Sequence, residues 1–188
     1  MLLLLIGTSS AGKTSLARHL QDVLPDYWQY MSLDDFFAGV PGRYGGGING
    51  PLSQVGFAYR NKAESASITY GELGYRVLKG MIAAALSMES VGINVIFDDM
   101  IIDHAHASLW KEALQGVEFM VVRLVAPVPV LRERNARRNN PPGLAENHIA
   151  MNELIASDLE IDSGSIRFED AAETIAKVLA NKTVNRIP

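Results

Sequence analysis

The stretch Leu2-Leu3-Leu4-Leu5-Ile6-Gly7-Thr8-Ser9-Ser10-Ala11-Gly12-Lys13-Thr14 decides the fold of this chain. Its second part matches the pattern G-x-x-x-x-G-K-[ST] of a phosphate-binding loop. In such a loop the backbone N–H groups surround the phosphates of a nucleotide, the lysine reaches the β and γ oxygens, and the last hydroxyl is a magnesium ligand. The sequence therefore predicts that residues 7–14 bind a nucleotide and that Thr14 contacts Mg²⁺.

The residues on either side of the loop are those that the motif requires. The apolar run before it is typical of a buried parallel strand. Apolar residues after it recur at helical spacing, at Leu16, Leu20, Val23 and Leu24. An ordinary glycine-rich turn with a solvated Lys13 is the alternative, and this context disfavours it. We predict the order strand, phosphate loop, helix.

Length and composition narrow the class of protein. The chain has 188 residues, which favours one domain spanning residues 1–188. No apolar stretch approaches the roughly 20 residues that span a bilayer, so we expect no membrane insertion. The net charge of −4 gives no broad attraction to nucleic acid. The absence of cysteine excludes disulfides and fits a cytoplasmic protein. Whether the chain forms homo-oligomers stays open.

Apolar runs and helical periodicity alternate along the rest of the chain. Strands are expected at residues 27–33, 94–99, 119–125 and 159–161, and helices at 70–90, 105–114, 128–138, 145–155 and 169–179. Strands that alternate with helices at this spacing indicate an α/β fold, in which a parallel sheet is covered on both faces.

Two segments differ from this regular pattern. Residues 36–67 are dense in glycine, which predicts an irregular insertion in the region that binds the substrate. Residues 128–143 contain a basic helix that ends at Asn139-Asn140-Pro141-Pro142-Gly143. We interpret this second segment as a lid that carries arginines.

Carboxylates follow the predicted strands at the edge of the sheet where ligands bind. Asp98 and Asp99 end an apolar strand, which is how a Walker B acid is placed to hold magnesium. We favour Asp98 for the metal, with Asp99 facing the substrate. A solvated strand end or a helix cap is the alternative.

Asp34 comes directly after the second predicted strand. Phosphoryl transfer to a hydroxyl requires a carboxylate that orients the attacking oxygen and takes its proton. Asp34 is the candidate for this catalytic base. Asp35 could serve instead, because periodicity does not say which side chain faces the crevice, and the pair could also cap the next helix.

The predicted lid helix is rich in arginine. Arg134 and Arg138 share one helix face at a spacing of i, i+4, whereas Arg137 neighbours Arg134 at i, i+3, and Arg132 precedes both. In a lid, such arginines would close over the phosphates and neutralise the charge that develops during transfer. A solvated basic helix face is the alternative.

His104 and His106 lie beside Asp103 and superficially resemble a metal cluster. Residues two apart diverge on a helix, so the spacing is poor for two ligands of one metal. A role at the start of a helix or in substrate contact is favoured over a zinc site.

Taken in order, these segments resemble the chloramphenicol phosphotransferase family of P-loop kinases. The resemblance rests on the phosphate loop, Leu20-Gln21-Asp22-Val23-Leu24-Pro25, Asp34, Val95-Ile96-Phe97-Asp98-Asp99, Arg134-Asn-Ala-Arg-Arg138 and Asp158-Leu-Glu-Ile-Asp162. It implies a three-layer α/β/α, nucleotide-kinase-like P-loop NTPase fold with a five-stranded parallel sheet. It also implies ATP- and Mg²⁺-dependent transfer of the γ-phosphate to a hydroxyl of a small molecule.

The resemblance further implies roles for single residues. The catalytic aspartate of the family falls on Asp34, beside Lys13, and its lid arginines fall on Arg134 and Arg138. The arginine-glycine-aspartate run of the family is replaced here by Arg138-Asn139-Asn140. Because the 36–67 insertion also diverges, the acceptor stays open: chloramphenicol, a nucleotide, a sugar acid or another metabolite.

Two other classes of function make different demands on the sequence. A GTPase switch would require Asn-Lys-x-Asp and Asp-x-x-Gly, but the chain has Asn181-Lys182-Thr183-Val184 and Asp98-Asp99-Met100-Ile101. A nucleotide-binding ATPase module without an acceptor of its own would not require Asp34.

Overall fold

A five-stranded parallel sheet forms the centre of the molecule. The computed structural model describes residues 1–45, 54–61 and 63–184. The strands lie in the order β2 (Trp28–Ser32), β5 (Asn94–Asp99), β1 (Leu2–Ile6), β6 (Phe119–Val125) and β7 (Leu159–Asp162). Every neighbouring pair is parallel. The phosphate loop follows β1, the central strand.

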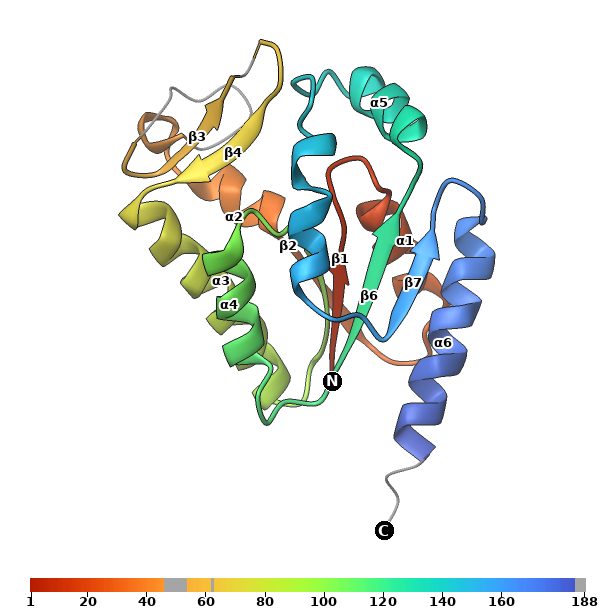
Figure 1. The fold of residues 1–188 in the computed structure, drawn as a ribbon. Coiled ribbons are helices and arrows are strands. Elements are labelled where there is room, and N and C mark those ends of the chain that lie inside the picture. The colour runs from red at the N-terminus through yellow and green to blue at the C-terminus, as the bar shows by residue number, and fades with distance from the viewer. Residues whose placement is uncertain (46–53, 62, 185–188) are drawn as a thin grey trace.

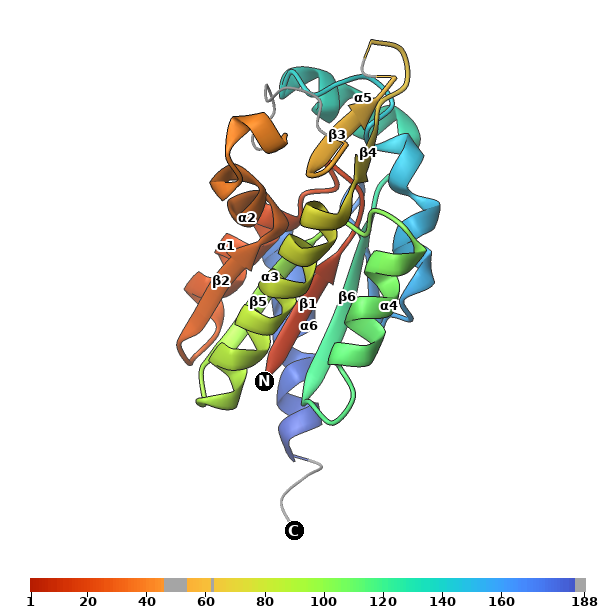
Figure 2. The same cartoon turned by 90° about the vertical axis from the view of Figure 1, so that its left-hand side faces the viewer.

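Helices cover both faces of this sheet (Figures 1 and 2). Side chains alternate across β1, so that Leu2, Leu4 and Ile6 join one core and Leu3 and Leu5 join the other. The first core lies against α3 (Glu72–Ser90) and α4 (His104–Ala113), and the second against α1 (Lys13–Val23) and α6 (Phe168–Val184). The predicted three-layer α/β/α fold with five parallel strands is therefore confirmed.

Further elements lie beyond the carboxyl ends of the strands. An antiparallel hairpin of β3 (Phe57–Arg60) and β4 (Ser67–Tyr70) stands on one side and α5 (Val128–Arg137) on the other (Figure 1). The short helix α2 (Leu33–Gly39) and the 3₁₀ turn η1 (Gly42–Tyr44) connect β2 to this region. The ligand-binding edge of the sheet is thus flanked by two arms.

The structure differs from expectation in the 36–67 segment. This segment holds the end of α2, the turn η1 and the strand β3, and β4 begins at its last residue, so it is less irregular than its glycine content suggests. The backbone of Gly45 has φ 82°, and a Cβ there would lie 1.8 Å from the Phe57 carbonyl oxygen, so glycine permits the close approach of the two segments. Residues 46–53 and 62 of the predicted insertion lie outside the described residues.

The predicted helix at 145–155 is wrong. Two 3₁₀ segments, η2 (Glu146–His148) and η3 (Ala150–Leu154), occupy this stretch. Side chains compete here for the carbonyls that an α-helix would use: Asn152 Nδ2 donates to the His148 carbonyl, and His148 Nδ1 lies 2.9 Å from the Leu144 carbonyl oxygen. Polar side chains that bond to the backbone four residues earlier favour the tighter turns.

Candidate active site

The phosphate loop runs from the end of β1 into the first turn of α1. Gly12 precedes the helix with a left-handed φ of 95°. A Cβ at Gly7 would lie 2.5 Å from the Leu124 carbonyl oxygen, so glycine is required where the chain leaves β1 beside β6. Because α1 begins at Lys13, within the loop, the N-terminus of this helix faces the loop. This arrangement binds anions.

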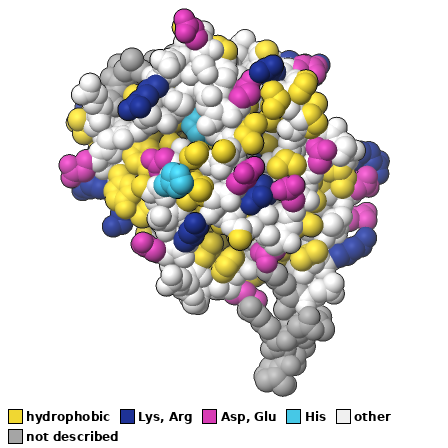
Figure 3. All heavy atoms as spheres, viewed as in Figure 1, with side chains coloured by type: hydrophobic (Ala, Val, Ile, Leu, Met, Phe, Trp, Pro, Cys, Tyr) yellow, Lys and Arg dark blue, Asp and Glu magenta, His cyan; other side chains and the backbone are white. Residues whose placement is uncertain are grey.

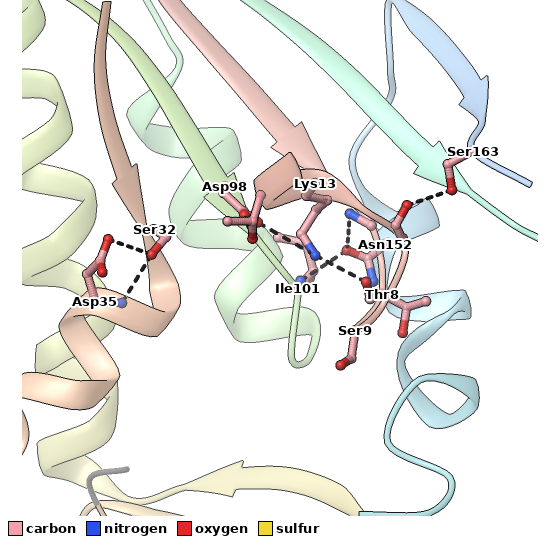
Figure 4. A network of polar contacts seen from close by, with 12 residues as sticks. Thr8, Ser9, Lys13, Ser32, Asp35, Asp98, Ile101, Asn152 and Ser163 are labelled. Carbon is pink, nitrogen blue, oxygen red and sulfur yellow. Dashed lines mark hydrogen bonds and ion pairs between the residues drawn. The ribbon is translucent and has the colours of Figure 1, made fainter. Parts of the chain in front are cut away.

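Asp98 lies opposite this loop, together with Lys13 and Thr14. Thr14 Oγ1 donates to Asp98 Oδ2 at 2.7 Å, and Lys13 Nζ lies 3.6 Å from Asp98 Oδ1. Lys13 Nζ also donates to the Thr8 carbonyl at 3.1 Å (Figure 4). Tyr30 donates its hydroxyl to Asp98 Oδ2, and burial together with the Asp98 charge raises the pKa of Tyr30 to about 12. The predicted metal pair, Thr14 and Asp98, is in contact.

Asp99 points to the other face of the sheet, which corrects the expectation that it faces the substrate. Its carboxylate is fully buried, where Trp110 Nε1 donates to Oδ2 at 2.5 Å and His106 Nε2 lies 3.1 Å away. Successive residues of a strand point to opposite faces, so Asp98 and Asp99 separate. Asp99 attaches β5 to α4.

The histidines near Asp103 do not line the site. His106 is fully buried, and its Nδ1 accepts from the backbone N–H of Ile102 at 3.3 Å. His104 begins α4, and the preceding Asp103 caps the helix by accepting from His106 N. Within the described part of the chain, no group of His, Cys, Asp and Glu could hold a metal by itself.

Replacing Asp99 with Asn is expected to lower the free energy of unfolding by about 2 kcal/mol. The amide keeps one acceptor oxygen but directs N–H groups at donors in a fully buried place. Chemical denaturation measures the change, with the exposed Asp22→Asn in α1 as the control. Equal stabilities for the two variants would contradict the importance of the Asp99 contacts.

The cap of α2 separates the roles of Asp34 and Asp35. Ser32 Oγ accepts from the Asp35 N–H at 3.1 Å and donates to Asp35 Oδ2 at 2.7 Å, so Ser32 and Asp35 together cap the helix. Burial raises the pKa of Asp34, the nearby Lys13 opposes this, and the charge of Asp98 adds to it. The helix-capping interpretation thus applies to Asp35. Asp34 lies near Lys13 of the phosphate loop, and the charge of this lysine lowers its pKa.

A cavity of about 620 Å³ joins the phosphate loop to Asp34. Lys13, Thr14 and Asp98 line it at the loop, and Asp34 and Arg138 line it as well. Asp35 lines it too, beside Ser9, Ser10, Gly12 and Asn140. The rest of its wall is apolar: Leu33, Phe37, Ala38, Ile68, Met100, Ile102 and Leu144. Tyr59 of the hairpin also contributes, and burial and the Asp34 charge raise the pKa of its hydroxyl.

The arginines of the predicted lid have different surroundings. Arg138 lines the cavity, whereas Arg134 donates to the hydroxyl and the carbonyl of Ser163, at 3.0 and 2.7 Å. Arg132 and Arg137 are exposed and form ion pairs with acidic side chains, Glu146 and Glu133. The solvated-face interpretation therefore describes Arg132 and Arg137, while catalytic roles for Arg134 and Arg138 stay predictions.

Asn152 is a residue of the site that no sequence motif indicated. Its Oδ1 accepts from the backbone N–H groups of Gly7 and Ile101, both at 3.1 Å, so it joins the phosphate loop to the segment after β5 (Figure 4). The side chain is 2% exposed. Asn152 is separated from Gly7 by 145 residues, and only folding brings them together.

Polar side chains of the phosphate loop contact α5 and the chain that follows it. Thr8 Oγ1 donates to the Ala145 carbonyl, Asn140 Nδ2 donates to Ser9 Oγ at 3.3 Å, and Ser10 Oγ lies 3.5 Å from Asn135 Oδ1. On the other side, Ser163 Oγ donates to the Ala11 carbonyl at 2.6 Å. Four residues of the predicted nucleotide-binding loop, Thr8 to Ala11, are thus in polar contact with residues 135–145 and with Ser163.

Fold and site together define a nucleotide-kinase-like P-loop protein. Solved structures are similar to this chain at low sequence identity. A sugar kinase from a Janibacter species is 17% identical with a TM-score of 0.65, over 95% of this chain and 94% of its own. The tunicamycin resistance protein of Deinococcus radiodurans is 19% identical with a TM-score of 0.64, over 95% and 94%. The Mycobacterium tuberculosis APS kinase, solved with AMPPNP and APS, is 15% identical with a TM-score of 0.63, over 95% and 96%.

The family model described as chloramphenicol phosphotransferase-like protein matches residues 1–180. The chain belongs to this family, which confirms the resemblance found in its sequence. No curated protein sequence matches it significantly. At these identities, the solved structures support the fold.

Proposed function

We propose that this protein is a small-molecule kinase that transfers the γ-phosphate of ATP to a hydroxyl group. The observation that carries the proposal is the continuous cavity that brings Lys13 and Thr14 together with Asp34. A nucleotide-binding module without an acceptor has no need of a carboxylate at that place. Membership in the chloramphenicol phosphotransferase-like family supports the same reaction class.

The side chains have distinct tasks in this reaction. Asp34 accepts a hydrogen bond from the acceptor hydroxyl, orients its oxygen toward the γ-phosphorus and takes its proton. The new P–O bond forms as the bond between the γ-phosphorus and the ADP oxygen breaks. Lys13, with Arg138 and Arg134 from the lid segment, stabilises the negative charge on the transferred group.

The donor set fits Mg²⁺. Thr14 Oγ1 and Asp98 Oδ2 are hard oxygen ligands only 2.7 Å apart. Magnesium usually takes one or two protein oxygens and completes its shell with water and phosphate oxygens. When bound, the ion would neutralise charge on the phosphates, and Thr14 and Asp98 would hold it beside the loop.

The cavity wall favours an uncharged acceptor with apolar surface. Among the described residues that line the cavity, the cationic side chains are Lys13 of the phosphate loop and Arg138 of the lid segment. A carboxylate or phosphate on the acceptor would require a further arginine or lysine. On the face shown in Figure 3, acidic and basic side chains of the described residues are interspersed, so this face has no basic patch that would bind a polyanion. No described helix is long and apolar enough to cross a bilayer.

A screen of hydroxyl compounds for acceptor-dependent ADP release tests this function. It should include chloramphenicol, uncharged antibiotics, nucleosides, sugars and sugar acids. We expect turnover with an uncharged amphipathic alcohol, and turnover at least about a hundredfold slower in the Asp34→Asn variant. Turnover restricted to sugar acids or nucleotides would contradict the proposed acceptor class. If no compound is turned over and Asp34→Asn leaves basal hydrolysis unchanged, the kinase proposal fails.

The acid limb of the pH profile is expected to lie above the ordinary range of an aspartate. Activity requires the ionised Asp34, and burial raises the pKa of this carboxyl. Activity should therefore fall as the pH decreases through this raised pKa. In Lys13→Arg, which keeps the cation, the limb of kcat/KM should stay in place. A limb at the ordinary aspartate pKa would contradict the assignment of Asp34 as the base.

A further inference from the structure

The β3–β4 hairpin forms a roof over part of the acceptor cavity. Tyr59 and Ile68 are cross-strand partners, and both line the cavity. Since partners in an antiparallel pair share a face, the hairpin presents one face to the cavity. The position of this hairpin therefore affects how much space the cavity leaves beside Asp34.

One end of the hairpin is anchored to the body of the protein. The ring of Phe57 packs edge-on against Phe37 of α2, with 4.9 Å between centroids. The Tyr70 hydroxyl donates to Asp103 Oδ1 at 2.5 Å, at the start of α4. Phe57 and Tyr70 are cross-strand partners, so these contacts hold the start of β3 and the end of β4.

The other end of the hairpin is held by the segment that follows the lid helix. Asn147 Nδ2 donates to the Ala66 carbonyl at 2.9 Å and to Ser65 Oγ at 3.0 Å. The backbone N–H of Ala66 donates to the Pro142 carbonyl at 2.7 Å. His148 Nε2 accepts from the backbone N–H of Ile68 at 3.3 Å. Ile68 is itself a residue of the cavity wall.

The two contacts of His148 require one particular form of the imidazole. The Ile68 N–H is a donor, so Nε2 must be unprotonated, and the Leu144 carbonyl oxygen, 2.9 Å from Nδ1, requires a proton there. The side chain is 2% exposed. Burial lowers the pKa of His148, which keeps the ring neutral. Both nitrogens are thus used in joining the hairpin to residue 144.

The segment that holds the hairpin also holds the phosphate loop. Thr8 Oγ1 donates to the Ala145 carbonyl, and the Gly7 N–H donates to Asn152. Asn147 and His148 lie between these two attachments. The hairpin is therefore placed relative to the phosphate loop through a short, continuous stretch of chain.

We propose that Asn147 and His148 are positioning residues of the acceptor site, which hold the hairpin face with Tyr59 and Ile68 over the cavity. The inference rests on the proposed function in that the cavity is taken as the acceptor site. In this position the roof excludes water from the γ-phosphate and leaves room for the acceptor. When the contacts are lost, the hairpin loosens and water reaches the site.

Two substitutions at one position separate the contacts. In His148→Gln, Oε1 replaces Nε2 and can accept from the Ile68 N–H. In His148→Asn, Nδ2 replaces Nδ1 and can donate to the Leu144 carbonyl, but the hairpin contact is lost. Hydrogen exchange should show amides of β4 exchanging about tenfold faster in His148→Asn than in His148→Gln, with amides of β1 unchanged in both. Asn147→Ala should resemble His148→Asn, and His104→Asn on the surface is the control.

ATP itself provides the second readout, since hydrolysis uses water as the acceptor. We expect His148→Asn to hydrolyse ATP about threefold faster than His148→Gln, with affinities for AMPPNP within about twofold of each other. A purely structural role would leave hydrolysis equal. Equal exchange of the β4 amides in the two variants overturns the proposal, as does a loosened hairpin without a change in hydrolysis. Failure of the wild-type protein to bind AMPPNP would contradict the proposed kinase function instead, and the exchange comparison would still decide the role of His148 in holding the hairpin.

Discussion

Asp34→Asn is expected to lower kcat by about 10²–10⁴-fold with the acceptor found in the screen. The amide cannot take the proton of the attacking hydroxyl, although it keeps the size and the hydrogen-bonding capacity of the side chain. The KM for ATP should change little, since Asp34 is not part of the phosphate loop. Steady-state kinetics with each substrate varied in turn measures both effects.

Asp35→Asn is the matched comparison for this substitution. Its carboxylate belongs to the cap of α2, so we expect a loss of about 1 kcal/mol in stability and a small effect on kcat. The opposite result, a large loss of kcat in Asp35→Asn alone, would transfer the role of base to Asp35.

Stability supplies an independent check on Asp34. A raised pKa means that the folded protein binds this proton more tightly than the unfolded chain does. The ionised carboxylate therefore opposes folding above its raised pKa, and this effect disappears as the pH falls through that pKa. At neutral pH, Asp34→Asn should melt no lower than the wild-type protein. A lower Tm would mean that Asp34 serves the fold.

Lys13→Ala is expected to lower kcat/KM by about 10²–10³-fold and to weaken ATP binding. Lys13 Nζ donates to the Thr8 carbonyl and lies 3.6 Å from Asp98, so it stands over the loop where the phosphates would bind. A ligand that binds only the folded state stabilises it by about 2.7 kcal/mol at a hundred times its Kd. ATP with Mg²⁺ should therefore raise the Tm of the wild-type protein and have much less effect on Lys13→Ala.

Lys111→Ala, an exposed lysine of α4, is the control for the removal of a positive charge. It should retain the full effect of ATP on the Tm. Should ATP and Mg²⁺ leave the Tm of the wild-type protein unchanged, or stabilise Lys13→Ala equally, the loop would not be a working nucleotide site. Lys13→Ala should also move the acid limb of any residual activity upward, because Lys13 lowers the pKa of Asp34.

Much of the fold could be predicted because its signals are local. The apolar run of β1, the loop pattern after it and the helical spacing of α1, α3 and α6 involve residues close together in the chain. The 145–155 segment shows where local signals fail. We predict a polar α-helix there, but side-chain bonds of His148 and Asn152 to backbone carbonyls favour 3₁₀ turns.

The pairs of adjacent acids show a second limit. The sequence could not distinguish the role of Asp34 from that of Asp35, or the role of Asp98 from that of Asp99. Both members of each pair are carboxylates at a strand end. In each pair the surroundings decide: Ser32 bonds to Asp35, and Trp110 bonds to Asp99. Asp99 is thereby turned away from the cavity, whereas Asp35 lines it together with Asp34 and Asp98 but has its carboxylate bonded to Ser32.

By itself, the sequence determined the phosphate loop, the α/β class and the set of carboxylates at the sheet edge, because these depend on residue types at short, regular spacings. The tertiary structure decided which carboxylate and which arginine line the cavity, and that Asn152, Asn147 and His148 join the loop to the hairpin. Those contacts depend on the direction of each side chain and on segments that meet only after folding, such as Gly7 and Asn152, which lie 145 residues apart.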